Sequence, residues 1–169
     1  VYAQAQRSLR SSNYNSAIEQ LELLEARFPF GRFAEQAQLE LVYARYMTLD
    51  LEGARSGADR FIRLHPGHAN VDYAYYLKGL SAYRDSSNLL DVLFSADQAT
   101  RDMAPLQEAY ADFAIFLGRF PESQYAPDAQ QRMVHLRNVL ARSELAVADF
   151  YMRRGAYIAA GNRARFVLE

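Results

Sequence analysis

Few residues in this sequence are of the types that perform acid–base or metal chemistry. His65 and His68 flank a Pro-Gly turn, where two imidazoles can reach one metal ion, but no third ligand accompanies them. Asp97 and Asp102 surround Arg101 in a polar stretch that is typical of a solvated loop rather than of an acid–base pair. We therefore expect no catalytic residue, no metal ion and no cofactor.

Composition narrows the remaining function classes. The sequence has no cysteine, which excludes disulfides, thiolate metal ligands and cysteine nucleophiles within it. A net charge of −1 over 169 residues argues against nucleic acid as a partner. The sequence contains no phosphate loop, dinucleotide fingerprint or hydrolase serine elbow. No run of about 18 apolar residues predicts a membrane-spanning helix. We predict a protein that is not an enzyme.

An internal repeat organises the chain. Three stretches share the same residue types at the same six offsets, with alanine first, hydrophobic residues four and seven positions later, and proline after one further turn. The copies are Ala17, Leu21, Leu24, Phe28, Pro29 and Ala37; Ala54, Ala58, Phe61, His65, Pro66 and Ala74; and Ala109, Phe113, Phe116, Phe120, Pro121 and Ala129. A fourth copy begins at Tyr157 and Ala160.

The spacing within each copy predicts two helices joined by a turn. Apolar residues at these offsets form one face of a helix, and the proline forbids its continuation. The first two prolines are 37 residues apart, close to the 34 residues of a tetratricopeptide repeat, and the next two are 55 apart. The third repeat therefore holds an insertion of roughly 20 residues, at 84–104.

These observations predict an all-α fold, a right-handed tetratricopeptide solenoid of about four helix pairs in one domain, 1–169. The repeats cover approximately 1–30, 31–67, 68–122 and 123–169, the last including the start of a fifth. We expect Asn13 and Asp50 to cap helices at 14–28 and 51–64. A fifth helix is expected from about 70 to 83 and a short one at 88–94. Residues 127–154 form either one helix or two with a break near Arg142.

Tyrosines mark the surface on which we expect binding. Helices that begin a tetratricopeptide repeat normally line the inner side of the solenoid. Six tyrosines fall on such helices in the second and third repeats: Tyr43, Tyr46, Tyr73, Tyr75, Tyr76 and Tyr83. Tyrosine suits a binding surface because it offers a large ring, few rotors and a polar tip. The other interpretation is that several of them are core aromatics.

The end of the chain carries an excess of arginine. Between residues 142 and 169 there are five arginines against three acidic residues. They are Arg142, Arg153, Arg154, Arg163 and Arg165. This pattern is explained either by a solvated helix face or by an edge that docks an acidic partner.

Several strings in the sequence also resemble one family. They are Phe28-Pro29-Phe30-Gly31, the segment 60–66 (RFIRLHP), Asn70-Val71-Asp72-Tyr73, Ser123-Gln124-Tyr125 and Arg154-Gly155-Ala156-Tyr157. Together with the interrupted third repeat they resemble the BamD (ComL) family, the tetratricopeptide lipoproteins of the outer-membrane β-barrel assembly machinery. The resemblance extends over nearly the whole chain.

The resemblance implies a location and a set of partners. Members have five repeats and an acylated N-terminal cysteine that anchors them to the periplasmic face of the outer membrane; the anchor is expected outside this chain. Their N-terminal repeats receive targeting segments of unfolded outer-membrane proteins and contact BamC. Their C-terminal repeats dock on the periplasmic domains of BamA.

Site residues follow from the resemblance and from the patterns together. Arg163, within Asn162-Arg163, matches the family's arginine at the BamA contact, and we group Arg154 and Asn162 with it. Phe28, Phe30, Tyr43 and Tyr46 match the N-terminal groove, to which we add Tyr73 and Tyr76. The alternative function is a periplasmic tetratricopeptide coordinator that links cell-wall synthesis to the envelope.

Overall fold

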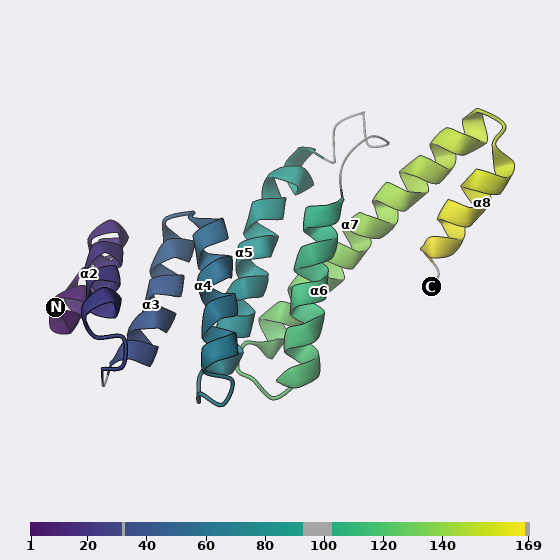
Figure 1. The fold of residues 1–169 in the computed structure, drawn as a ribbon. Helices are drawn as coiled ribbons and strands as arrows, with labels where there is room; N and C mark the ends of the chain where they lie inside the picture. Colours follow the sequence, from purple (N-terminus) through teal and green to yellow (C-terminus); the bar gives the residue numbers. More distant parts are fainter. Residues whose placement is uncertain (32, 93–102, 168–169) are drawn as a thin grey trace.

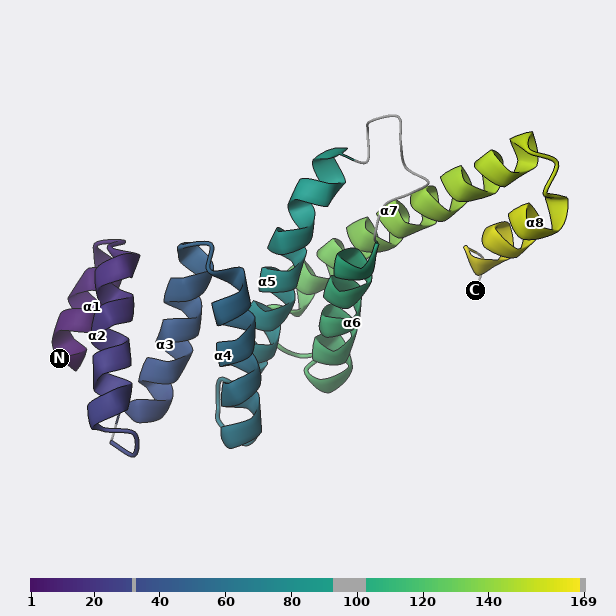
Figure 2. The same ribbon diagram turned by 45° about the horizontal axis from the view of Figure 1, so that its top comes forward.

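A computed structural model describes residues 1–31, 33–92 and 103–167. Within these residues the chain forms eight α-helices and no strand. Their bounds are α1 Tyr2–Arg10, α2 Tyr14–Arg27, α3 Ala34–Met47, α4 Leu51–Leu64, α5 Val71–Val92, α6 Ala104–Arg119, α7 Ala126–Arg153 and α8 Tyr157–Phe166. Consecutive helices pack against each other in sequence order, so the molecule is elongated and its two termini lie at opposite ends (Figures 1 and 2). The predicted all-α repeat fold is confirmed, and its handedness and repeat boundaries stay predictions.

The turns that follow α2, α4 and α6 begin with the same backbone conformation. Phe28, His65 and Phe120 have φ between −129° and −137° and ψ between 55° and 60°. The carbonyl of each accepts the N–H three residues further on, at 3.0–3.1 Å. A proline follows each of them and adds a fixed φ without an N–H that needs a partner. The internal repeat seen in the sequence is therefore present in the main chain.

The turns between α1 and α2, α3 and α4, and α7 and α8 each contain a left-handed residue, and a side-chain helix cap follows it in the first two. Ser12, Leu49 and Gly155 have φ of 57°, 67° and 74°. After the first two, the side chains of Asn13 and Asp50 accept the N–H groups of residues 16 and 53, at 3.3 and 3.0 Å. Both predicted N-caps are confirmed.

Small residues lie where neighbouring helices approach most closely. Ala17, Ala54 and Ala109 are completely buried and Ala160 is almost so. Four of the fully buried large side chains stand at positions of the repeat: Leu21, Phe61, Phe113 and Phe116. Leu77, Leu106 and Leu136 are fully buried beside them in the sequence of stacked helices. One continuous core cluster extends from α3 to α7, which is how stacked pairs bury faces that a single pair leaves exposed.

The insertion differs from the expectation. The helix expected to end near Tyr83 continues to Val92, because no glycine or proline stops it. The separate short helix expected at 88–94 is therefore wrong over 88–92, and its last two residues lie outside the described residues. Asp97, Arg101 and Asp102 lie outside them as well. The chain resumes at α6, where Pro105 occupies the first turn.

α7 is one helix of 28 residues, which settles the alternative of a break near Arg142. Its first half packs on α6 and it pairs with α8. Figures 1 and 2 show its second half, together with α8, extending away from the other helices. Among the described residues, no helix combines the length and the apolar character needed to cross a membrane.

Candidate functional site

Tyrosines gather where α3, α5 and the start of α7 meet. α3 contains Tyr43 and Tyr46, and α5 contains Tyr73 and Tyr76; the two helices contact each other although α4 separates them in the chain. All four rings pack against the main core cluster and remain partly exposed. Helical spacings of three place each pair on one side of its helix. We call these four residues and Tyr125 the tyrosine face.

A pocket lies within this face. Its walls include Tyr43 of α3, Tyr73 of α5 and Tyr125 of the turn before α7. The remaining lining residues are Gln36, Leu39, Glu40 and Asn70. The tyrosine pocket thus combines three phenol rings with amide and carboxylate groups, which can hold an apolar side chain and also bind backbone N–H and C=O groups.

Ring contacts hold the pocket in shape. Tyr125 stacks on Tyr76 with centroids 4.8 Å apart and lies against Tyr73 at 5.1 Å. The Tyr76 hydroxyl donates to Asp128 Oδ2 at 2.6 Å, and Arg132 also donates to that oxygen at 2.6 Å. These bonds fasten α5 to the first turns of α7, so the rings present a prearranged surface.

Four phenols of the face stay neutral, those of Tyr43, Tyr73, Tyr76 and Tyr125. Burial raises the pKa of Tyr73 well above its usual range, and the charges of neighbouring phenols would add to this. Burial and the hydrogen bond to Asp128 raise the pKa of Tyr76. Burial also raises the pKa of Tyr43 and of Tyr125. At physiological pH these four hydroxyls can therefore both donate and accept a hydrogen bond.

Two other predicted tyrosines have different surroundings. Tyr75 packs on Phe120 at 5.3 Å, with the Arg119 guanidinium 5.4 Å from its ring centre. Tyr83 contacts Arg132, whose guanidinium lies 4.9 Å from its ring centre. Neither ring lines the tyrosine pocket. Tyr46 does not line it either and is covered by the Arg84 guanidinium at 5.2 Å.

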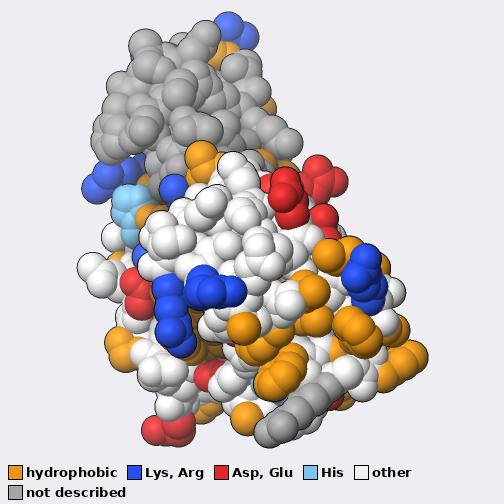
Figure 3. All heavy atoms as spheres, turned by 90° about the vertical axis from the view of Figure 1, so that its left-hand side faces the viewer, with side chains coloured by type: hydrophobic (Ala, Val, Ile, Leu, Met, Phe, Trp, Pro, Cys, Tyr) orange, Lys and Arg blue, Asp and Glu red, His pale blue; other side chains and the backbone are white. Residues whose placement is uncertain are grey.

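Phe28 and Phe30 lie in the turn between α2 and α3, outside the tyrosine pocket. Phe28 is 56% exposed and Phe30 is 98% exposed. Figure 3 shows hydrophobic side chains gathered over the lower part of this N-terminal end of the molecule. The structure places the two phenylalanines on the surface but does not bring them into one pocket with the tyrosines.

The C-terminal hairpin of α7 and α8 carries the predicted basic residues. Arg163 Nη1 lies 3.2 Å from Glu144 Oε2, so this arginine ties α8 to α7 while remaining half exposed. Arg154 lies over the Phe150 ring at 4.2 Å, and Asn162 is exposed. The same hairpin also exposes large apolar side chains, which include Leu145, Met152, Tyr157 and Ile158, the last 84% exposed. We call this surface the hairpin face.

The two histidines of the Pro-Gly turn have structural contacts. Glu35 of α3 lies 3.6 Å from His65 Nδ1 and 3.7 Å from His68 Nε2, and both rings pack on Phe61. Gln38 Oε1 lies 3.1 Å from the other nitrogen of His65. No group of three metal-binding side chains is found in the described part of the chain.

A cluster of charges around one buried carboxylate was not predicted from the sequence. Asp112 is nearly buried between Arg55 of α4, at 2.9 Å, and Lys78 of α5, at 3.3 Å. Arg55 also binds Glu108 at 2.7 Å, and Lys78 binds Asp59 at 2.8 Å. A charged residue directly before the core position Phe113, together with the only lysine of the chain, was the available signal. The cluster joins three helices and offers no free nucleophile.

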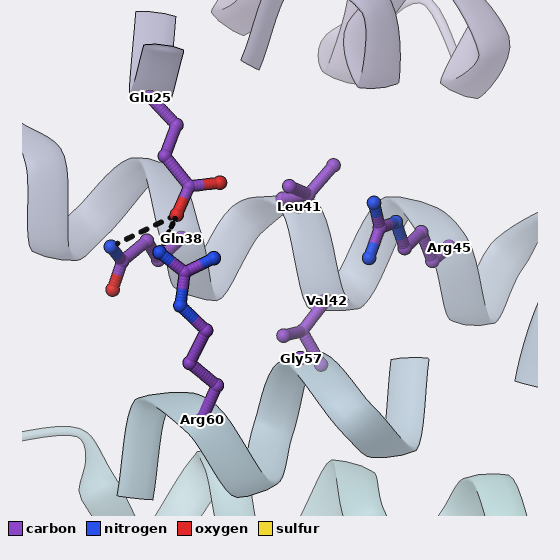
Figure 4. Close-up of a pocket in the computed structure, with 7 residues that line it drawn as sticks. All are labelled: Glu25, Gln38, Leu41, Val42, Arg45, Gly57 and Arg60. Carbon is purple, nitrogen blue, oxygen red and sulfur yellow. Dashed lines mark hydrogen bonds and ion pairs between the residues drawn. The ribbon is translucent and has the colours of Figure 1, made fainter. Parts of the chain in front are cut away.

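A second pocket lies between α2, α3 and α4. Its floor contains Val42 and Gly57, and Glu25 reaches across it to Arg60 at 2.8 Å and to Gln38 at 3.2 Å (Figure 4). A Cβ on Gly57 would stand 3.0 Å from the Val42 side chain, so the two helices approach closely here. Glu25, Gln38 and Arg60 already bind one another, and Arg45 binds Glu22, so the pocket contributes to packing between pairs.

Comparison with known proteins gives a family match over residues 1–169, to a model described as "YfiO: Outer membrane lipoprotein". A protein of Neisseria meningitidis serogroup B is 48% identical over 168 residues, covering 99% of this chain and 63% of that protein. A Vibrio cholerae protein is 46% identical over 165 residues, covering 98% and 68%. A Xylella fastidiosa protein is 40% identical over 169 residues, covering 100% and 58%.

All three relatives are named outer membrane protein assembly factor BamD. The chain spans less than two thirds of the length of the neisserial relatives that it matches.

Proposed function

Because this chain belongs to the YfiO family of outer membrane lipoproteins, we propose that it is the helical-repeat scaffold of an outer membrane protein assembly factor. The proposal involves no reaction. The scaffold binds other polypeptides on two surfaces, the tyrosine face and the hairpin face, and acts at the periplasmic side of the outer membrane through a lipid anchor. The observation that carries it is the tyrosine pocket in a chain that matches this family along its whole length.

The tyrosine face receives the targeting segments of unfolded outer-membrane proteins. Such segments alternate aromatic or aliphatic side chains with polar ones when they are extended. The neutral phenols of Tyr43, Tyr73 and Tyr125 offer ring area to the first kind and hydroxyl groups to the peptide backbone. Stacking between Tyr76 and Tyr125 already orders these rings, so their side chains lose little conformational entropy when a peptide binds. Phe28 and Phe30, which are exposed in the turn between α2 and α3, contact other parts of the same segments outside the pocket.

Peptide binding tests this part of the proposal. Fluorescently labelled peptides from the last strands of barrel proteins bind the wild-type chain, and Tyr43→Ala weakens binding about tenfold, the loss expected for one ring at an interface centre. Tyr46→Ala weakens it less, because Arg84 covers this ring. Tyr157→Ala, which removes an exposed ring of α8, is the matched control. Equal affinities for the Tyr43 variant and this control contradict the assignment.

The hairpin face docks on the periplasmic domains of BamA. Exposed tyrosine, isoleucine and methionine beside arginine form the composition that is enriched at protein interfaces. Arg163 and Arg154 offer guanidinium groups to acidic side chains of the partner, and Asn162 adds an amide. BamC binds the N-terminal repeats, where Phe28 and Phe30 are exposed.

The internal Arg163–Glu144 pair decides how docking must be tested. Arg163→Glu both removes the partner contact and places two carboxylates together within the hairpin. Glu144→Arg combined with Arg163→Glu restores the internal pair while keeping the reversed charge on α8. If the proposal holds, the single and the double variant both lose co-purification with BamA, and Glu144→Gln keeps it. Recovery of BamA by the double variant assigns Arg163 to hairpin stability instead.

A further inference from the structure

Glu40 is an acidic residue of the tyrosine pocket with an incomplete set of partners. Its Oε1 accepts three hydrogen bonds, from Tyr2 Oη at 3.1 Å, Gln6 Nε2 at 2.6 Å and Gln36 Nε2 at 2.9 Å. Its Oε2 is buried and has no hydrogen-bond partner among the described residues. A buried carboxylate oxygen left without a donor is costly, so a donor that reaches this atom when a ligand enters the pocket is favoured.

The charge of Glu40 is also uncompensated within the described residues. Each of its three donors is a neutral group, and no ion pair to Glu40 is found there. The negative carboxylate adds to the effect of burial in raising the pKa of Tyr2 to about 12. Three donors on one oxygen fix the carboxylate in place, and the second oxygen stays without a donor in a residue that lines the pocket.

The walls of the pocket favour a cation. Tyr43, Tyr73 and Tyr125 surround Glu40 with phenol rings, and the faces of such rings attract ammonium and guanidinium groups. The amides of Gln36 and Asn70 supply carbonyl oxygens for the remaining N–H groups. A carboxylate next to several tyrosines is a site for a positively charged side chain, whereas a purely apolar side chain leaves Glu40 Oε2 without a donor.

We propose that the tyrosine pocket binds the lysine or arginine side chain of an extended peptide, with the Glu40 carboxylate as its counter-charge. The inference rests on the proposed function of the tyrosine face and specifies which kind of residue that face selects. Client segments with a basic residue among aromatic ones are then preferred over segments of the same hydrophobicity without it.

Three synthetic peptides test the selection. Each has twelve residues of alternating threonine and tyrosine and differs only at one central position, which is lysine, glutamine or glutamate. Fluorescence anisotropy with the wild-type chain shows the lysine peptide binding about tenfold more tightly than the glutamine peptide, as expected for a desolvated cation on aromatic rings and a carboxylate. The glutamate peptide binds most weakly.

Glu40→Gln keeps the side-chain shape and one acceptor oxygen, and it removes the preference for lysine, leaving the lysine and glutamine peptides within about twofold of each other. Glu19→Gln, an exposed change of the same charge on α2, is the control and keeps the preference. Glu40→Lys reverses the order so that the glutamate peptide binds best. Circular dichroism confirms that each variant is helical.

The outcomes separate the inference from the function on which it rests. Equal binding of all three peptides by the wild-type chain, or a lysine preference that survives Glu40→Gln, overturns the inference and leaves the tyrosine face as a peptide site. Absence of binding by all three peptides, together with no binding of barrel-protein segments, overturns both. An unchanged order of affinities in Glu40→Lys also contradicts the role of Glu40.

Discussion

Asp112→Asn removes the charge at the centre of the buried cluster and should weaken the joint between α4, α5 and α6. The Asp112 side chain is 8% exposed and lies 2.9 Å from Arg55 and 3.3 Å from Lys78. Losing one partner of a buried ion pair costs about 3–5 kcal/mol, because the other charge remains desolvated. Arg55 and Lys78 each keep a second acidic partner, and their side chains are 24% and 21% exposed, so water partly solvates the remaining charges. We therefore expect about half of that cost, ~2 kcal/mol.

Thermal unfolding followed by circular dichroism measures this loss. For a chain of this size ~2 kcal/mol corresponds to a melting temperature lower by about 4–8 °C. Asp59→Asn is the matched control: its side chain is 41% exposed and pairs with the same Lys78, so it costs under about 1 kcal/mol. A loss at Asp112 no greater than at Asp59 would refute the reasoning that burial makes this carboxylate important.

Three further predictions concern single side chains. Leu49→Gly raises the free energy of unfolding by about 1 kcal/mol, because the φ of 67° at Leu49 strains a leucine by about that amount and does not strain a glycine. Urea unfolding measures the change, and a lower stability of the variant would contradict the prediction. Gly79→Ala lowers stability by about 1–3 kcal/mol, since its Cβ would stand 2.8 Å from the Phe113 ring; an unchanged urea midpoint would show that the ring moves freely. Burial alone would raise the pKa of Asp128, but hydrogen bonds from Arg132 and Tyr76 lower it, so its stabilising effect is present above pH ~4 and is lost as the pH falls through the lowered folded-state pKa. Wild type and Asp128→Asn should therefore differ in melting temperature at pH 7 and converge near pH 2; a constant difference would contradict the linkage.

The sequence was sufficient for the fold because each signal in it is local. Asn13 and Asp50 act as caps through bonds to residues three positions away, and each turn proline acts on its own backbone. The 28 residues of α7 follow from the absence of a glycine or proline in its interior. The same rule, applied to the residues after Tyr83, would have predicted the extension of α5 to Val92.

The binding surface was predicted less completely because it depends on contacts between distant segments. Tyr43 and Tyr73 were identified from their helices, but Tyr125 lies in a turn and enters the pocket only because α7 starts against α5. Glu40 lies on α3 among core positions and gives no sequence signal, since its partners Tyr2 and Gln6 come from α1. The Arg163–Glu144 pair joins residues 19 apart, and the sequence showed only the arginine.

The three equivalent turns after α2, α4 and α6 carry different side chains at the same position. Phe30 in the first turn corresponds to Gly67 in the second and to Glu122 in the third, and the residues two positions earlier, Phe28, His65 and Phe120, have closely similar φ and ψ. Because this position is phenylalanine, glycine or glutamate in three equivalent turns, the turn does not require a particular side chain there. Phe30 is 98% exposed and is therefore not needed for the fold. Its ring can be replaced to measure its contribution to binding a partner without changing the stability of the protein.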